Sequence, residues 1–197
     1  MDVRAASKDD RDRVVVTLTR AFQADAIVRF LFRDDETYPH RAGLFFGHYF
    51  DVRLAGGEVF VAGDDVAGAA LWNPPGGNRL GSSFVEEHWQ RTVVAAVTAE
   101  EAARYEVFAS VLGAMTPPEP HWYLGLLGTD PGRQRTGIAR ALLSPMLARA
   151  DREGRPVFLE TGMPQNLAFY QRLGFEQIAD AVVPDGPRVW GLLRRGA

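Results

Sequence analysis

Gln134-Arg135-Thr136-Gly137-Ile138-Ala139 decides the fold of this chain, because of the segments on either side of it. The apolar run 122–128 precedes this hexapeptide, has the character of a β-strand, and is followed by an Asp-Pro-Gly turn signal at 130–132. The segment after the hexapeptide places apolar residues at helical spacings from Leu142 to Ala150. A strand, a tight basic loop and a helix therefore follow one another.

Such a junction is suited to binding an anion. The first N–H groups of a helix have no partner within it, and the positive end of the helix dipole lies at the same point. A phosphate or pyrophosphate therefore binds well there, and Gly137 lets the backbone approach it because no Cβ intervenes. Arg133, Arg135 and Arg140 add positive charge at the rim. The loop has neither the Lys-Ser/Thr of a Walker loop nor the three glycines of a dinucleotide fingerprint.

The composition limits the class of protein. At 197 residues the chain predicts a single domain, 1–197, with 46% hydrophobic and 24% charged residues. A net charge of −3 argues against general nucleic-acid binding. The absence of cysteine removes disulfides and thiolate nucleophiles, and the histidines show no metal-ligand spacing, so no metal is expected. No apolar run reaches the roughly 20 residues of a membrane span, and no signal-peptide core begins the chain. We therefore expect a cytoplasmic monomer or homodimer without nucleic-acid or membrane partners.

The remaining segments predict an α+β fold, with a mixed sheet and helices on both of its faces. In chain order we expect a strand at 3–6, a helix that starts near 7–10 and runs to 22, and one or two more helices within 27–32 and 44–52. A hairpin of strands at 58–62 and 66–72, an Ala-rich helical segment over 83–115, a strand at 157–160, a short helix at 165–172, and strands at 175–179 and 188–193 follow. A Pro-rich connector at 116–120 lies inside the domain.

Two blocks of sequence resemble the GCN5-related N-acetyltransferase (GNAT) family. Gln134, Gly137 and Ala139 match its motif Gln/Arg-x-x-Gly-x-Gly/Ala, and the block 158–175 has the Asn, Tyr and Gly-Phe of its next motif at the expected spacing. The resemblance implies a mostly antiparallel twisted sheet with a splayed pair of central strands, and acetyl-CoA as co-substrate. It also implies an N-terminal part (1–120) that shapes the acceptor site, an acetyl-CoA-binding core (121–175) and C-terminal strands (176–197).

The resemblance also assigns the donor site, where free backbone groups of the central strand pair with the acetyl oxygen and the pantetheine arm. The matching positions are Leu126, Leu127, Gly128 and Thr129 on the strand, Gln134, Arg135, Thr136, Gly137, Ile138, Ala139 and Arg140 on the loop and helix start, and Asn166 and Tyr170 in the second block. Structural roles alone would also suit these residues: a plain central strand, a helix N-cap for Asn166, and a half-buried core tyrosine.

Three side chains are candidates for catalysis. The family commonly places a tyrosine near the sulfur, and the phenol of Tyr170, with a pKa of about 10, could protonate the departing thiolate. Glu160 ends an apolar strand, so its carboxylate is expected to face a cleft and to act as general base with a raised pKa; a salt bridge or simple solvation is the alternative. His121 is a rival base. A weakly basic amine would need none.

Trp72 and Glu160 are the candidate substrate-binding residues, since strand ends line clefts; Trp190, Phe30, Phe32 and Phe46 are more typical of a core. The sequence thus predicts an acetyl-CoA-dependent N-acetyltransferase that acts on a primary amine of a small molecule by direct attack in a ternary complex, because no cysteine is present for an acyl-enzyme. The alternative is a catalytically silent acetyl-CoA-binding or regulatory module.

The C-terminal half is further similar to the puromycin N-acetyltransferase subgroup of the family. The similarity lies in segments 121–124, 158–161, 166–175 and 183–188. In this fold the acceptor contacts come largely from the early helices, where the similarity is weakest, so the acceptor stays unnamed.

Overall fold

The structure is a computed structural model that describes residues 2–196. The strands are β1 (Val3–Ala5), β2 (Glu58–Ala62), β3 (Gly68–Asn73), β4 (Trp122–Thr129), β5 (Val157–Thr161), β6 (Glu176–Val182) and β7 (Arg188–Arg194). The helices are α1 (Arg11–Ala21), α2 (Ala26–Leu31), α3 (Tyr38–Gly56), α4 (Gly81–Thr92), α5 (Ala99–Met115), α6 (Ile138–Glu153) and α7 (Leu167–Gln171). No helix within 2–196 is both long and apolar enough to cross a membrane.

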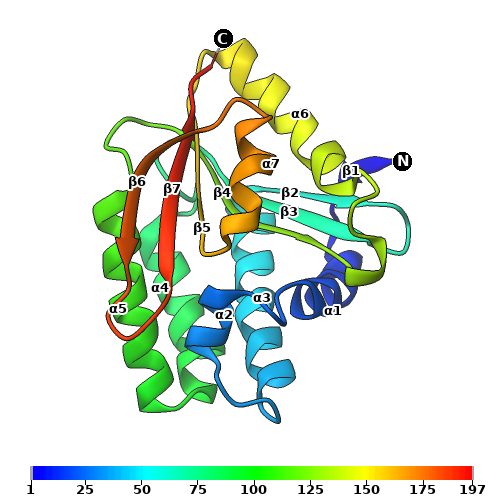
Figure 1. Ribbon diagram of the computed structural model, residues 1–197. Coiled ribbons are helices and arrows are strands. Elements are labelled where there is room, and N and C mark those ends of the chain that lie inside the picture. Colours follow the sequence, from blue (N-terminus) through cyan, green and yellow to red (C-terminus); the bar gives the residue numbers. More distant parts are fainter. Residues whose placement is uncertain (1, 197) are drawn as a thin grey trace.

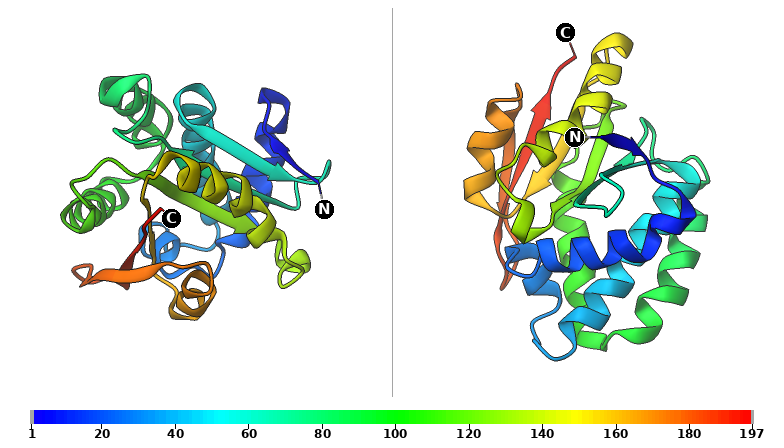
Figure 2. Two further views of the ribbon diagram at one scale, coloured as in Figure 1. Left: turned by 90° about the horizontal axis from the view of Figure 1, so that it is seen from above. Right: turned by 90° about the vertical axis from the view of Figure 1, so that its right-hand side faces the viewer.

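The strands form one twisted seven-stranded sheet in the order β1-β2-β3-β4-β5-β7-β6 (Figure 1). Only β4 and β5 pair in parallel; the other neighbours are antiparallel. Two apolar clusters cover the two faces of the sheet. One contains residues of α1 to α5, and the other residues of α6 and α7, so the sheet lies between two helical layers. Figure 2 shows helices on both sides of the sheet. The expected mixed sheet with helices on both faces is confirmed.

The central strands β4 and β5 diverge after a short paired stretch. Their register ends at Leu124 opposite Leu159, after three pairs. Beyond that point β5 stays bonded to β7 as far as Thr161, whereas β4 stays bonded to β3 as far as Thr129. The edge of β4 that faces β5 is therefore open from Gly125 onward, and the expected splayed pair is present.

A bulge marks the point of divergence. Leu71 of β3 lies opposite Leu126 and Trp72 lies opposite Leu124, which leaves Gly125 without a partner on β3. The extra residue reverses the alternation of β4, because Leu124 belongs to the cluster under α6 and Leu126 to the cluster on the opposite face. The second half of β4 is thus reoriented where the strands separate.

The helical segment expected over 83–115 is present, but it is divided into two helices. Helix α4 ends at Thr92, a short 3₁₀ turn follows at Val94–Ala96, and α5 begins after Thr98. Thr98 and Glu101 form a capping box: the Thr98 hydroxyl accepts from the N–H of Glu101, and the Glu101 carboxylate accepts from the N–H of Thr98. This reciprocal cap fixes a new helix start inside the Ala-rich segment.

Candidate active site

The loop before α6 has the geometry of an anion cradle. Gly137 occupies the N-cap position of α6 with φ of +90°, and no side chain within the described residues caps this helix start. A Cβ on Gly137 would meet nothing within 4 Å, so the space above the helix start is open. Arg135 is also left-handed, with φ of +62°. The N–H groups at the start of α6 therefore face open space, as an anion requires.

A cavity of about 680 Å³ lies over this loop and the open end of β4. It brings together most of the residues expected to bind the donor: Leu127, Gly128, Thr129, Gln134, Arg135, Gly137, Ile138, Ala139, Arg140, Asn166 and Tyr170. Leu126 lines the neighbouring cavity instead. The Thr136 hydroxyl turns away and donates to the carbonyl of Arg133 at 2.6 Å. Arg133 does not belong to the rim of the cradle, because its guanidinium pairs with Asp65 at 2.7 Å.

Asn166 and Tyr170 stand where this donor cavity meets a second one. Both residues line both cavities. Asn166 is the N-cap residue of α7, but its side chain does not cap the helix; its Nδ2 donates to Oγ1 of Thr161 at 3.2 Å. Tyr170 lies one helical turn later, 7% exposed, with its ring against Phe169 and Phe175. Burial raises the pKa of Tyr170, so the phenol stays protonated at neutral pH.

The second cavity, of about 330 Å³, is rich in aromatic side chains and is called the aromatic cavity below. Its aromatic lining residues are Phe22, Phe45, Tyr49, Tyr105, Phe108, Tyr123 and Tyr170. The hydroxyls of Tyr49 and Tyr105 join α3 to α5 by a 2.8 Å hydrogen bond. The same cavity contains three ionisable groups of other kinds, namely Asp25, Arg53 and Glu160. A small apolar molecule with a few polar groups fits such a space.

Glu160, the candidate general base, lies at the point where β4 and β5 diverge. It lies on β5 just beyond the last pair with β4, and it lines both the aromatic cavity and a groove beside the Pro-rich connector. Burial raises the pKa of Glu160 to about 7, while a hydrogen bond from Tyr123 and the charge of Arg53 oppose the rise. A carboxyl with this pKa is half ionised near neutral pH and exchanges protons readily.

The expectation for Trp72 is corrected. Trp72 is fully buried in the cluster beneath α6, and the next residue, Asn73, lines the aromatic cavity. Neighbouring residues of a strand face opposite sides, so an offset of one position decides which of them reaches a cleft.

Most of the other aromatic candidates also belong to the core. Phe30, Phe32 and Phe46 are buried in the cluster of α1 to α5, and Trp190 packs at the edge of the other cluster. His121 lines the groove that also reaches Glu160, and its Nδ1 donates to the carbonyl of Glu119 at 2.7 Å. It therefore lies near the candidate base without lining the aromatic cavity.

Several lining residues were not found from the sequence, among them Asp25, Tyr49, Arg53 and Tyr105. Tyr49 and Arg53 are four residues apart on α3 and thus share a helix face, a spacing that was available in the sequence. Asp25 caps α2 by accepting hydrogen bonds from the N–H groups of Ile27 and Val28. An aspartate before a helix is explained by this capping alone, so nothing in the sequence indicated that it also lines a cavity.

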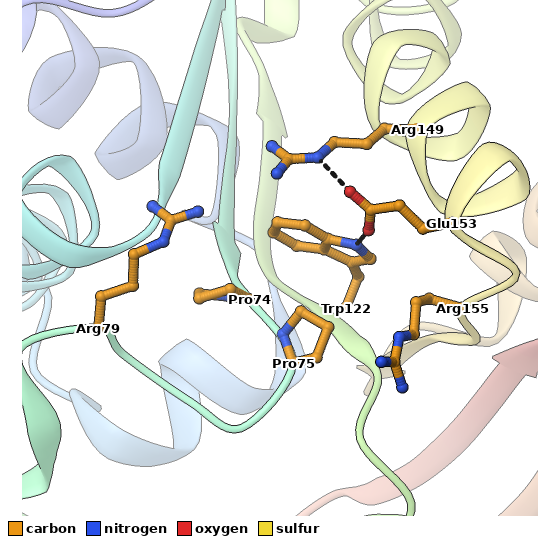
Figure 3. A pocket seen from close by; sticks show the side chains of 7 residues that line it. All are labelled: Pro74, Pro75, Arg79, Trp122, Arg149, Glu153 and Arg155. Atoms are coloured by element: carbon orange, nitrogen blue, oxygen red, sulfur yellow. Dashed lines mark hydrogen bonds and ion pairs between the residues drawn. The ribbon is translucent and has the colours of Figure 1, made fainter.

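A different hollow lies at the opposite ends of β4 and α6. Figure 3 shows Trp122 below Arg149 and Glu153, with Arg79 across the gap. The charges there are largely paired: Arg149 with Glu58 at 3.1 Å and Glu153 at 2.8 Å, and Arg79 with Glu58 at 2.8 Å. Glu153 also accepts from Nε1 of Trp122 at 2.8 Å. The charged side chains of this hollow thus largely neutralise one another. The hollow is also separate from the donor cavity and the aromatic cavity, which share lining residues.

Comparison with known proteins identifies the family. Residues 22–175 match the acetyltransferase (GNAT) family. A Schizosaccharomyces pombe protein described as an uncharacterized N-acetyltransferase is 24% identical over 184 residues, which are 89% of this chain and 74% of that protein.

Solved structures share the fold over nearly the whole chain. One is described as a histone acetyltransferase HPA2 and related acetyltransferase from Corynebacterium glutamicum, with a TM-score of 0.73, 22% identity, and coverage of 99% of this chain and 96% of that one. Another is arylalkylamine N-acetyltransferase 2 from Aedes aegypti, with a TM-score of 0.70, 16% identity, and coverage of 98% of each chain. The family match spans most of the chain and includes the cradle and Tyr170, so the protein belongs to the GNAT family, whose enzymes take the acetyl group from acetyl-CoA, and is an N-acetyltransferase.

Proposed function

We propose that this enzyme transfers the acetyl group of acetyl-CoA to a primary amine of a small molecule, by direct attack within a ternary complex. One observation carries the proposal: the donor cavity and the aromatic cavity meet at a shared wall that includes Leu127, Asn166 and Tyr170. A donor in the first cavity and an amine in the second would be in contact there. In this proposal the core 121–175 holds the donor, and the segment 1–120 supplies much of the acceptor wall through α2, α3 and α5.

The donor side fits the phosphate and pantetheine parts of acetyl-CoA. The open helix start at Gly137, with Arg135 and Arg140 beside it, would hold the pyrophosphate. The open edge of β4 after Gly125 would offer backbone N–H groups to the pantetheine arm and the acetyl oxygen. Donors fixed at this oxygen stabilise the charge that develops on it during transfer.

The reaction needs two proton transfers, and in this proposal Glu160 and Tyr170 each carry out one of them. Glu160 accepts a proton from the amine as the new C–N bond forms, directly or through water. Tyr170 donates to the sulfur as the C–S bond breaks. A phenol with a raised pKa is a weak acid, but a thiolate in the same buried place is equally poorly solvated, so its own proton affinity rises as well. Neither step needs a cysteine, and the chain has none.

Thiol release from acetyl-CoA in the presence of a panel of small amines tests the proposal. The panel includes arylalkylamines, agmatine, amino acids and puromycin, and mass spectrometry identifies the acetylated product. Turnover with at least one small amine, and rate plots that intersect when both substrates are varied, are the expected results. Tight binding of CoA by calorimetry without turnover on any amine would favour the silent binding module instead. Parallel rate plots would exclude the ternary complex.

A further inference from the structure

Arg53 is a buried cation without an ionic partner. The residue is 3% exposed and lines the aromatic cavity. Among the described residues its guanidinium makes no ion pair or hydrogen bond, and its Nε is sealed from solvent without a partner. Other arginines that leave the surface are paired; Arg194, for example, forms a two-pronged bridge with Asp151 at 2.6 and 2.9 Å. An unpaired buried charge is costly, so an unpaired guanidinium that lines a cavity is suited to bind an anion.

The guanidinium is held in a fixed orientation. Its Cζ lies 4.6 Å from the ring centroid of Tyr49, and that ring is fixed in turn by the hydrogen bond to Tyr105. On β4 it packs against Gly125, where a Cβ would collide with Nη2, Cζ and Nε. Gly125 is the bulge residue of β4. Glycine at the bulge therefore leaves space beside the backbone, and the guanidinium of Arg53 occupies that space.

Glu160 does not neutralise this cation by direct contact. The two side chains line the same cavity and each acts on the charge of the other, but no ion pair joins them within residues 2–196. Tyr123 hydrogen-bonds to Glu160 instead. Besides Asp25, whose carboxylate caps α2, the cavity therefore has a permanent positive group and a separate proton acceptor, with aromatic rings around them. A molecule that matches all three has a carboxylate, an amine and an apolar side chain.

We propose that Arg53 binds the carboxylate of the acceptor, and that the acceptor is an α-amino acid with an aromatic or large aliphatic side chain. The planar fork of a guanidinium matches a carboxylate with two parallel hydrogen bonds. The amine one carbon away then faces Glu160, and the side chain packs among rings such as Tyr105 and Phe108. This inference rests on the proposed function, because it names the acceptor class of the same site.

Matched acceptors test it in the wild-type protein. L-phenylalanine, L-phenylalaninamide and phenethylamine share the ring and the amine, but only the first has a carboxylate. We expect kcat/KM for L-phenylalanine to exceed that for the other two by about tenfold or more, as a charge-assisted hydrogen bond supplies. Equal values, or a preference for phenethylamine, would overturn the inference and leave the proposed function intact.

Binding of the products gives a readout that needs no turnover. In the presence of CoA, calorimetry should show N-acetyl-L-phenylalanine binding about tenfold or more tightly than its amide. Equal affinities would overturn the inference, whether or not any amine is turned over. If the expected difference in affinity is found but no amine is turned over, only the proposed function is contradicted.

Substitution of Arg53 separates recognition from an indirect effect on Glu160. In Arg53→Met the ratio of kcat/KM between L-phenylalanine and phenethylamine should fall to near one, and Arg53→Lys should keep part of it. If Arg53 only sets the proton affinity of Glu160, both acceptors lose rate equally and the pH profile shifts, which would contradict the inference. Thermal unfolding and CoA affinity show whether each variant keeps its fold. If a variant does not fold, the comparison of acceptors in the wild-type protein still tests the inference.

Discussion

Asn166 donates a hydrogen bond from Nδ2 to Oγ1 of Thr161 at 3.2 Å, and this contact ties the start of α7 to the end of β5. Tyr170 follows one turn later on α7 and lies at the wall shared by the two cavities. The position of the candidate acid is therefore set by the strand that also holds Glu160.

Removal of the Tyr170 hydroxyl should slow the chemical step and leave the donor in place. In Tyr170→Phe we expect kcat to fall about 100-fold, the scale of a lost general acid, with little change in CoA affinity. Thiol-release assays measure kcat, and calorimetry measures the affinity for CoA. Phe169→Leu, on the same helix beside Tyr170, is the matched control for a change in packing. Wild-type turnover in Tyr170→Phe would remove the acid role.

Glu160 predicts a rise of activity with pH. Burial raises the pKa of its carboxyl to about 7, so the ionised base form is scarce below that value and abundant above it. We expect kcat/KM to increase between pH 6 and 8 with an apparent pKa near 7, and Glu160→Gln to be slow and to lack this titration. A wild-type profile that stays in Glu160→Gln would assign the base to another group, His121 among them.

The same shift has an opposite effect on stability. The folded pKa of Glu160 lies above the unfolded value of 4.5, so the folded state binds the extra proton and loses relative stability as pH rises from about 4.5 to 7. Glu160→Gln should therefore gain stability relative to the wild type over this range. Denaturant unfolding at pH 5 and pH 8 measures the difference, and a constant difference would show that the carboxyl is not buried in solution.

The donor side of the site could be predicted because it is local in sequence. The cradle is seven consecutive residues, 134–140, and its decisive feature, the left-handed Gly137, follows from one residue type at a strand-to-helix junction. Asn166 and Tyr170, four residues apart at the start of α7, came from the family resemblance. The splay of β4 and β5 came from the family resemblance and not from the pattern of residues.

The acceptor side depends on contacts between distant segments, and sequence patterns do not provide these. Arg53 reaches the cavity from α3, Tyr105 from α5 and Glu160 from β5. Trp72 was misplaced by one residue, which on a strand reverses the face. The break between α4 and α5 was missed because Ala-rich composition outweighed the Thr98 to Glu101 capping box.

Gly137 offers a controlled test of the cradle. Gly137 and Gly154 lie at the two ends of α6, both with positive φ, and a Cβ on either would meet nothing within 4 Å. Alanine at each position should cost about 1 kcal/mol in the free energy of unfolding, since both backbones are left-handed. Only Gly137→Ala should also weaken CoA binding, by about tenfold, because its Cβ stands where the phosphate approaches. Equal CoA affinities in the two variants would contradict the cradle.

The histidine pair between α3 and α4 predicts an acid limit to stability. Nδ1 of His48 lies 2.9 Å from Nδ1 of His88, so one ring donates and the other accepts. Burial lowers the pKa of His48 to about 3, with the charges of His88 and Arg53 adding to the effect; burial also lowers the pKa of His88, which Asp51 opposes. Unfolding frees these rings to take up protons at their ordinary pKa of about 6.5.

The stability that this pair contributes is therefore present above pH 6.5 and is lost as pH falls toward 3, by up to about 1.4 kcal/mol per pH unit for each proton taken up. His48→Phe should flatten the loss between pH 6.5 and 4, measured by denaturant unfolding. His40→Asn, at an exposed position of the same helix, is the control and should leave the slope unchanged. Titration of Glu160 changes the free energy of unfolding in the opposite direction over this range, so the slope of that free energy against pH is compared between variants and the wild type. A slope in His48→Phe equal to that of the wild type would show that the histidine pair takes up protons in the folded state.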